Sequence, residues 1–148
     1  MAYAITMGKS VGNIRLGMSR EEVQSLLSDL KEWVEKPYGY DREVLSDFND
    51  DFMISYDENN NVDFILCTNP QSVSLNDYLI SEYSVWELYA VIRDLTDDTE
   101  VDETGFLSNS LGFGMTVSGE TAEDGSPYDV IDSVQVAVKD FWKNEPHS

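Results

Sequence analysis

The segment GNIRLGMSREEV, residues 12–23, contains the signals from which the fold of this 148-residue chain is predicted. Residues 12–18 are typical of a short strand, because glycines at both ends favour turns. Ser19 and Glu22 form a capping box, in which the Ser19 hydroxyl accepts the Glu22 amide and the Glu22 carboxylate accepts the Ser19 amide. The segment therefore predicts a strand followed directly by a helix that begins after Ser19.

An apolar stripe follows this capping box. Proline at position 37 and glycine at position 39 end the pattern. We therefore predict an amphipathic helix that extends to residue 34, with Trp33 among its core residues. The stripe recurs at helical spacing through Val23, Leu26, Leu27, Leu30, Trp33 and Val34.

The same order of signals recurs further along the chain. Residues 73–80 form a short extended run, and Ser84 with Glu87 forms a second capping box, 65 residues after the first. Each predicted helix is followed by a predicted hairpin. The first hairpin joins residues 52–56 and 62–67 through an Asn-rich turn at 57–61, and the second joins 111–117 and 134–138 through an acidic loop. The second apolar stripe comprises Leu88, Val91, Ile92 and Leu95.

These signals predict an α+β fold in a single domain, residues 1–148, built from two strand–helix–hairpin repeats. The repeats cover about residues 8–70 and 71–142. We expect their strands to join into one antiparallel sheet with both helices packed on one face. The other face of the sheet would then be free to bind a partner. The alternative is that short αβ patterns recur by chance.

The charge of the chain is strongly negative and unevenly distributed. It carries 9 Lys and Arg against 29 Asp and Glu, a net charge of −20. Residues 1–42 and 133–148 are balanced, whereas residues 43–132 contain a single basic residue, Arg93. This charge argues against binding to nucleic acid or to an anionic membrane. It indicates either a solvated, solubilising surface or a surface that attracts a basic protein.

Residues suited to catalysis or metal binding are sparse. One Cys and one His argue against a disulfide framework, a cysteine-rich zinc site and most His-dependent hydrolysis. Asp57, Asn59 and Asn61 match three positions of a calcium loop, but Val62 replaces the required glycine, so we predict a hairpin turn there. We expect no enzyme activity, no cofactor and no metal. Without a visible secretory signal or a membrane-spanning run, the expected location is the cytoplasm.

Residues 8–23, GKSVGNIRLGMSREEV, resemble the opening of small bacterial cytoplasmic proteins that act as immunity proteins, or immunity-like neighbours, of polymorphic and contact-dependent toxins. Residues 110–114 and 134–138 are similar to their second half. The LGMS stretch is also similar to the helix start of β-lactamase-inhibitor-like domains. The resemblance implies a helix pair on an antiparallel sheet and a role in toxin neutralisation, without assigning contact residues.

The favoured hypothesis is therefore an immunity protein that binds a basic toxin, such as a nuclease, through an acidic surface. A regulatory or ligand-binding module is the alternative, and a carboxylate- or metal-dependent enzyme is less favoured. Open sheet edges would also allow a homodimer. The candidate binding residues are Asp97, Asp98, Glu100, Asp102 and Glu103 as the leading patch, then Asp50 and Asp51, with Tyr38 and Tyr40 as interface anchors.

Overall fold

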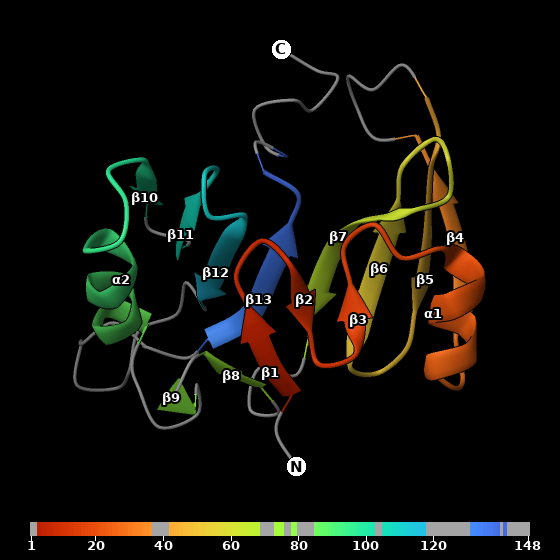
Figure 1. Cartoon of the computed structure of the whole chain (residues 1–148), viewed down its shortest axis with the longest axis horizontal. Coiled ribbons are helices and arrows are strands. Elements are labelled where there is room, and N and C mark those ends of the chain that lie inside the picture. Colours follow the sequence, from red (N-terminus) through yellow and green to blue (C-terminus); the bar gives the residue numbers. More distant parts are fainter. Residues whose placement is uncertain are drawn as a thin grey trace, which may run out of the picture.

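The described part of the chain folds into two β-sheets and two short helices (Figure 1). The computed structural model describes residues 3–36, 42–68, 73–75, 78–79, 85–102, 105–117, 131–139 and 141. The α+β class predicted from the sequence is confirmed, with strands predominating.

The larger sheet is antiparallel throughout and has eight strands. Its two halves are successive meanders along the chain, and their last strands, β7 and β13, pair at the centre of the sheet. In spatial order the strands are β10 (Thr99–Asp102), β11 (Gly105–Ser108), β12 (Phe113–Val117), β13 (Ile131–Ala137), β7 (Val62–Cys67), β6 (Phe52–Tyr56), β5 (Val44–Phe48) and β4 (Lys31–Glu35).

The smaller sheet contains a parallel pair, so the prediction of one antiparallel sheet is wrong. Strands β1 and β8 run parallel, with Tyr3 opposite Val73 and Ile5 opposite Leu75. Parallel neighbours need a long connection, and here the first meander of the large sheet lies between them in sequence. In spatial order the strands are β3 (Ile14–Arg15), β2 (Ser10–Val11), β1 (Tyr3–Thr6), β8 (Val73–Leu75) and β9 (Tyr78–Leu79).

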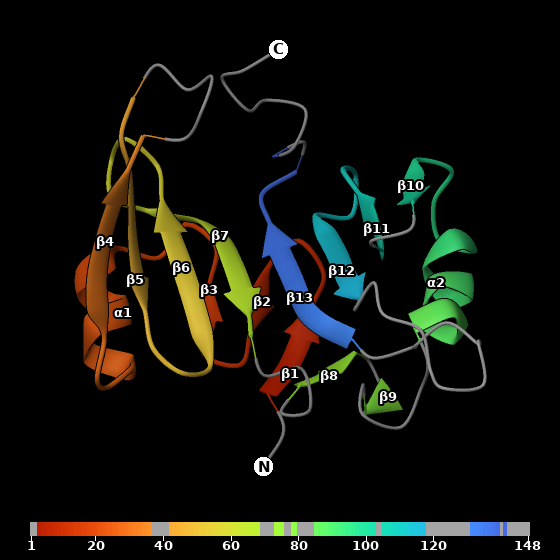
Figure 2. The ribbon, with the colours of Figure 1, turned by 180° about the vertical axis from the view of Figure 1, so that it is seen from behind.

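The two sheets form layers with the hydrophobic core between them. The smaller sheet and α1 (Arg20–Leu26) lie on the same side of the larger sheet, which is in the foreground when the molecule is seen from behind (Figure 2). No described helix covers the opposite side of β5, β6, β7, β12 and β13, which we call the outer face. The core side chains include Val11, Val23, Ile54, Ile65, Leu75, Leu88, Ile92, Phe113 and Val134.

The first helix is shorter than predicted. Its start is as expected, because Ser19 and Glu22 form the capping box, but it ends at Leu26, and Leu27 is extended. Asp29 then has a positive φ of 60°, and residues 31–35 form strand β4 instead of the last helical turn. Seven helical residues hold little intrinsic stability, so pairing of β4 with β5 prevails over the helical pattern. Trp33, predicted to be in the core, is 51% exposed.

The second helix, α2 (Val85–Arg93), occupies the predicted position. Its Leu88 and Ile92 are fully buried, as the apolar stripe predicts. Leu95, the last residue of that stripe, follows the end of the helix and is 54% exposed. The second capping box begins at Ser84, outside the described residues.

The strands of both predicted hairpins pair as expected, β6 with β7 and β12 with β13. The Asn-rich turn between β6 and β7 is held by Asp57, whose Oδ1 accepts the amides of Asn59 (2.8 Å) and Asn61 (3.1 Å). Asn60 takes a positive φ of 62°, which asparagine tolerates. Strands β1, β2, β5, β10 and β11 were not predicted, and the strand predicted at residues 12–18 is shorter, with only Ile14–Arg15 in β3.

Candidate protein-binding surface

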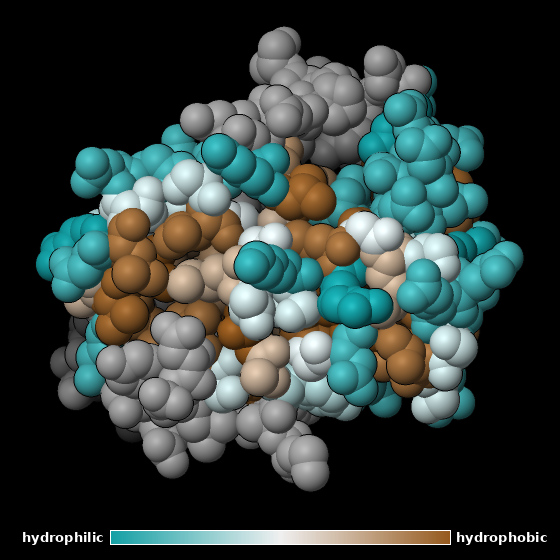
Figure 3. All heavy atoms as spheres, in the orientation of Figure 1, coloured by the Kyte–Doolittle hydropathy of each residue, from teal (hydrophilic) through white to brown (hydrophobic). Residues whose placement is uncertain are grey.

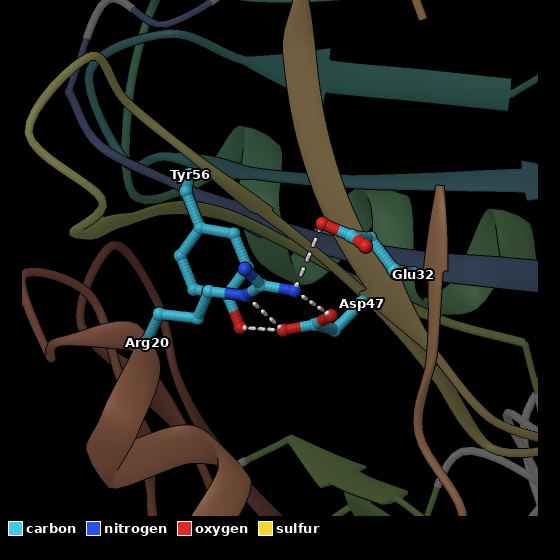
Figure 4. A network of polar contacts seen from close by, with 4 residues as sticks. All are labelled: Arg20, Glu32, Asp47 and Tyr56. Atoms are coloured by element: carbon cyan, nitrogen blue, oxygen red, sulfur yellow. Dashed lines mark hydrogen bonds and ion pairs between the residues drawn. The ribbon is translucent and has the colours of Figure 1, made fainter. Parts of the chain in front are cut away.

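A buried ion pair fixes α1 against the larger sheet. Arg20, the first residue of α1, donates from Nε and Nη2 to the two carboxylate oxygens of Asp47 in β5, both at 2.9 Å (Figure 4). The Tyr56 hydroxyl donates to the same carboxylate at 2.8 Å, and Glu32 lies 3.4 Å from Arg20 Nη2. Asp47 is only 2% exposed. Because each group of the network has its partner within it, we interpret it as a structural anchor of the sheet.

The electrostatics of this network favour its charged form. Burial alone would raise the pKa of Asp47, but the hydrogen bonds from Arg20 and Tyr56 outweigh it and lower that pKa. The Asp47 hydrogen bond in turn raises the pKa of Arg20, and burial together with Asp47 raises the pKa of Tyr56. Arg20 therefore stays ionised and cannot serve as a proton donor at the surface.

The acidic segment, which we define as residues 94–102, connects α2 to the sheet edge and includes β10. It contains five carboxyl groups and no Lys or Arg. Asp97 and Glu100 are exposed, and neither forms an ion pair with a described residue. Among the patch residues whose side chains the structure describes, these two are presented to solvent.

Asp98 has a different role from its neighbours. Its carboxylate accepts the Ser108 hydroxyl at 2.6 Å, and the amide and hydroxyl of Ser110 at 2.7 and 2.9 Å. Thr96 adds a fourth donor at 3.1 Å. Burial opposes ionisation, but these hydrogen bonds lower the pKa of Asp98 to about 2. Asp98 thus connects the acidic segment to the turn after β11. Because its carboxylate already accepts these hydrogen bonds, Asp98 is poorly placed to bind a partner.

Of the remaining predicted site residues, Asp50 and Asp51 are separated from this patch. The backbone of Asp102 pairs with Gly105 in β11, whereas Glu103, Tyr38 and Tyr40 lie outside the described residues. Asp50, which is exposed, and Asp51 lie in the turn between β5 and β6. Five strand spacings of about 4.8 Å separate β10 from β6, so the two acidic groups lie about 24 Å apart across the sheet.

Exposed apolar side chains accompany the acidic segment. Leu95 is 54% exposed, and Val101, in β10, is 49% exposed. Hydrophobic side chains also gather over α2 and the strands beside it in the view of Figure 3. Exposed apolar groups bordered by carboxylates are typical of protein interfaces, in which a polar rim surrounds an apolar centre.

A second apolar feature crosses the outer face. Strand register places one residue of each strand in a continuous row, which we call the outer row. It begins at Glu100 in the acidic segment, passes Phe48 near the β5–β6 turn, and ends at Lys31 in β4. Four of its central side chains are apolar and partly exposed. In order the row contains Glu100, Leu107, Gly114, Gln135, Leu66, Met53, Phe48 and Lys31.

The outer row contains a hollow at its β10 end. This depression of about 140 Å³ is lined by Gly105 together with Glu100, Leu107, Thr116 and Gln135. Glycine in a strand often marks a place where another chain approaches closely. The hollow has room for one side chain of a partner, with Glu100 beside it.

The sequence predicted the acidic patch but not these apolar groups. Leu95 was assigned to the buried stripe of α2, and Val101 had no assigned strand. Phe48 and Leu107 lie in strands that were not predicted. The signal that could have found the outer row is that residues 64–67 are all apolar, because a strand with one solvated face would alternate apolar with polar residues.

Asp63, in β7, is a partly buried carboxyl group whose negative charge the nearby Arg42 offsets only in part. Its Oδ1 has no hydrogen-bond partner, and burial together with Asp57 raises the pKa of Asp63 to about 6. A raised pKa means that the folded chain binds the proton more tightly than the unfolded chain does. Asp63 therefore lowers stability as the pH rises from about 4 to about 6.

We accordingly expect Asp63→Asn to raise the free energy of unfolding by about 1 kcal/mol at pH 7.5, after allowance for solvent screening. At pH 4 the variant and the parent chain should unfold at nearly the same urea concentration. Urea denaturation of both chains at pH 4 and at pH 7.5 measures this difference in the free energy of unfolding. An equal gain at pH 4 and 7.5 would show that the effect does not come from ionisation of Asp63.

Three further features bear on the chemistry of the chain. Cys67 is buried, and burial with Asp51 nearby raises the pKa of its thiol to about 12. Among the described residues, no group of three or more His, Cys, Asp or Glu side chains is arranged to hold a metal ion. No helix in the described ranges is long and apolar enough to cross a membrane.

Comparisons of the chain with known protein families, with curated proteins and with solved structures found no match.

Proposed function

We propose that this chain is a cytoplasmic bacterial immunity protein that binds and neutralises a basic toxin domain, such as a nuclease. The observation that carries the proposal is the exposed Leu95 and Val101 within the acidic segment. The segment supplies charge for recognition, and the two apolar side chains supply area that a partner can bury. The resemblance of residues 8–23 to immunity proteins points to the same class.

Charge and apolar area contribute differently to such a complex. The net charge of −20 attracts a basic domain over a distance and raises the association rate. Tight binding also needs buried apolar contacts near the centre of the interface. On the opposite face of the sheet from Val101, the outer row adds partly exposed apolar side chains from Leu107 to Phe48, beside Asp50 and Asp51. Glu100 at one end of this row and Asp50 and Asp51 near the other would lie at the rim of an interface on that face.

We also infer that the two halves of the chain arose by duplication of a unit with a leading strand, a helix and a four-stranded meander. The helices begin 65 residues apart, at Arg20 and Val85. The strand order supports the inference, because β4 to β7 and β10 to β13 take mirrored places on either side of the centre. The leading strands β1 and β8 are neighbours in the smaller sheet.

A ligand-binding module is the second candidate. It is favoured by a hollow of about 510 Å³ beside the β5–β6 turn, lined by Phe48, Lys31, Asp29, Asp50, Asp51, Ser28 and Asn49. Its carboxylates and aromatic ring suit a small organic cation. Such a role requires no toxin partner, so the test of the immunity proposal separates the two.

The test uses the product of the gene adjacent to the one that encodes this chain. The purified proteins should form a stable equimolar complex, and the chain should protect cells that express the neighbouring product. A chain that carries both Leu95→Asp and Val101→Asp should no longer protect these cells. The control variant Glu21→Ala, at an exposed position of α1, should still protect them. Absence of both a complex and protection would refute the immunity role.

A further inference from the structure

The two edges of the larger sheet differ in chemistry. Strand β10 forms one edge and lies in the acidic segment. Strand β4 forms the other edge of the described sheet (Figure 2), and all five of its residues are exposed. Trp33 and Val34, on its two faces, are each 51% exposed. The β4 edge thus presents unpaired backbone together with two large apolar side chains.

An exposed strand edge is a template for pairing with another chain, and proteins commonly protect it with charge. The β10 edge has such protection, since Glu100 and Asp102 carry the same charge and would repel a second copy. The β4 edge lies in residues 1–42, where acidic and basic residues balance. Two copies that each carry −20 charges can therefore approach at β4 with less repulsion than at the acidic middle of the chain.

The sequence of β4 is complementary to itself in one antiparallel register. If Trp33 lies opposite Trp33 of a second copy, Lys31 lies opposite Glu35 on the same face, once on each side of the tryptophans. Oppositely charged residues and aromatic residues are both favourable cross-strand pairs. The Trp33 Nε1 already donates to Glu35 Oε2 at 3.1 Å, which holds the indole along the strand.

We propose that the chain forms a two-fold symmetric homodimer in which β4 pairs antiparallel with β4 of a second copy, centred on Trp33. The pairing joins the two larger sheets into one continuous sheet and covers the apolar edge. A two-fold axis through Trp33 makes both copies equivalent, as in most homodimers. The dimer does not depend on a toxin, so it goes beyond the immunity role and can be tested without that partner.

Sedimentation equilibrium of the full chain over a range of concentrations tests the dimer. We expect a reversible monomer–dimer equilibrium. Lys31→Glu should weaken it about tenfold, because two attractive pairs become repulsive. Lys31→Glu combined with Glu35→Lys should restore the parent affinity, since the pairs are then reversed. A monomer at every concentration up to about 1 mM, or a dimer that Lys31→Glu leaves unchanged, would overturn the proposal.

Cysteine substitution tests the register. Trp33→Cys places the new thiol opposite its own copy, within disulfide distance, so mild oxidation should give a covalent dimer. Val34→Cys is the matched control, because residue 34 has the same exposure but lies opposite residue 32, about 7–8 Å diagonally from its own copy. The native Cys67 is buried and does not compete. Equal crosslinking at positions 33 and 34 would contradict this register.

Discussion

Replacing Gly112 by alanine is expected to lower the free energy of unfolding by about 3 kcal/mol. Gly112 has a φ of +63°, which alanine adopts at a cost. A methyl group there would overlap the carbonyl oxygen of Ala137 and lie 3.0 Å from the Cα of Gly8. Both neighbours are backbone atoms, so neither can rotate away. The Gly112 carbonyl also accepts the Ala137 amide at 2.9 Å, and displacement of the turn would weaken this bond.

Gly17→Ala is the matched control for this prediction. Gly17 has a φ of +85°, but nothing lies within 4 Å of the position that its methyl group would occupy. The decrease in the free energy of unfolding of Gly17→Ala should therefore reflect the backbone conformation alone and amount to about 1 kcal/mol. Urea denaturation of both variants separates the two costs. Equal losses at the two positions would show that the close packing of Gly112 against Gly8 and Ala137 contributes nothing.

Asp47→Ala is expected to destabilise the fold by about 3 kcal/mol. The substitution leaves the partly buried Arg20 and the buried Tyr56 hydroxyl without their acceptor. Because the fold lowers the pKa of Asp47, its stabilisation is present at neutral pH and is lost as the pH falls below about 4. The difference between the variant and the parent chain should therefore shrink in acid.

Glu32→Ala provides the comparison within the same network. The Glu32 side chain is 57% exposed and lies 3.4 Å from Arg20, so its loss should cost about 0.5 kcal/mol or less. Urea denaturation at pH 7 and at pH 3 measures both variants. If Asp47→Ala and Glu32→Ala were equally stable, the anchoring role of Asp47 would be disproved.

The local signals in the sequence predicted local structure well. The Ser19 capping box and the Asp57–Asn61 turn depend on hydrogen bonds between residues two to four apart, so both can be inferred from spacing. The end of α1 could not be inferred in this way. Leu30, Trp33 and Val34 fit a helical stripe, and only pairing with β5, itself not predicted, makes residues 31–35 a strand.

Longer-range features were beyond the reach of spacing arguments. The parallel pair of β1 with β8 joins residues 70 positions apart, such as Tyr3 and Val73. In the candidate surface, the charge pattern identified Asp97 and Glu100 but could not distinguish Asp98 from them. Two of the residues that donate to Asp98 lie ten and twelve residues further along the chain, Ser108 at the end of β11 and Ser110 in the turn after it.

The most direct test of the proposed binding surface is the association rate of the chain with the product of the adjacent gene, measured by stopped flow. The doubly substituted Asp97→Lys, Glu100→Lys chain should associate at least tenfold more slowly than the parent chain at about 50 mM salt, with the difference vanishing at about 500 mM. Glu21→Lys with Glu58→Lys changes the net charge equally, at exposed positions away from the acidic segment, and should slow association less. Equal rates for the two variants at low salt would contradict the assignment of the acidic segment as the binding surface.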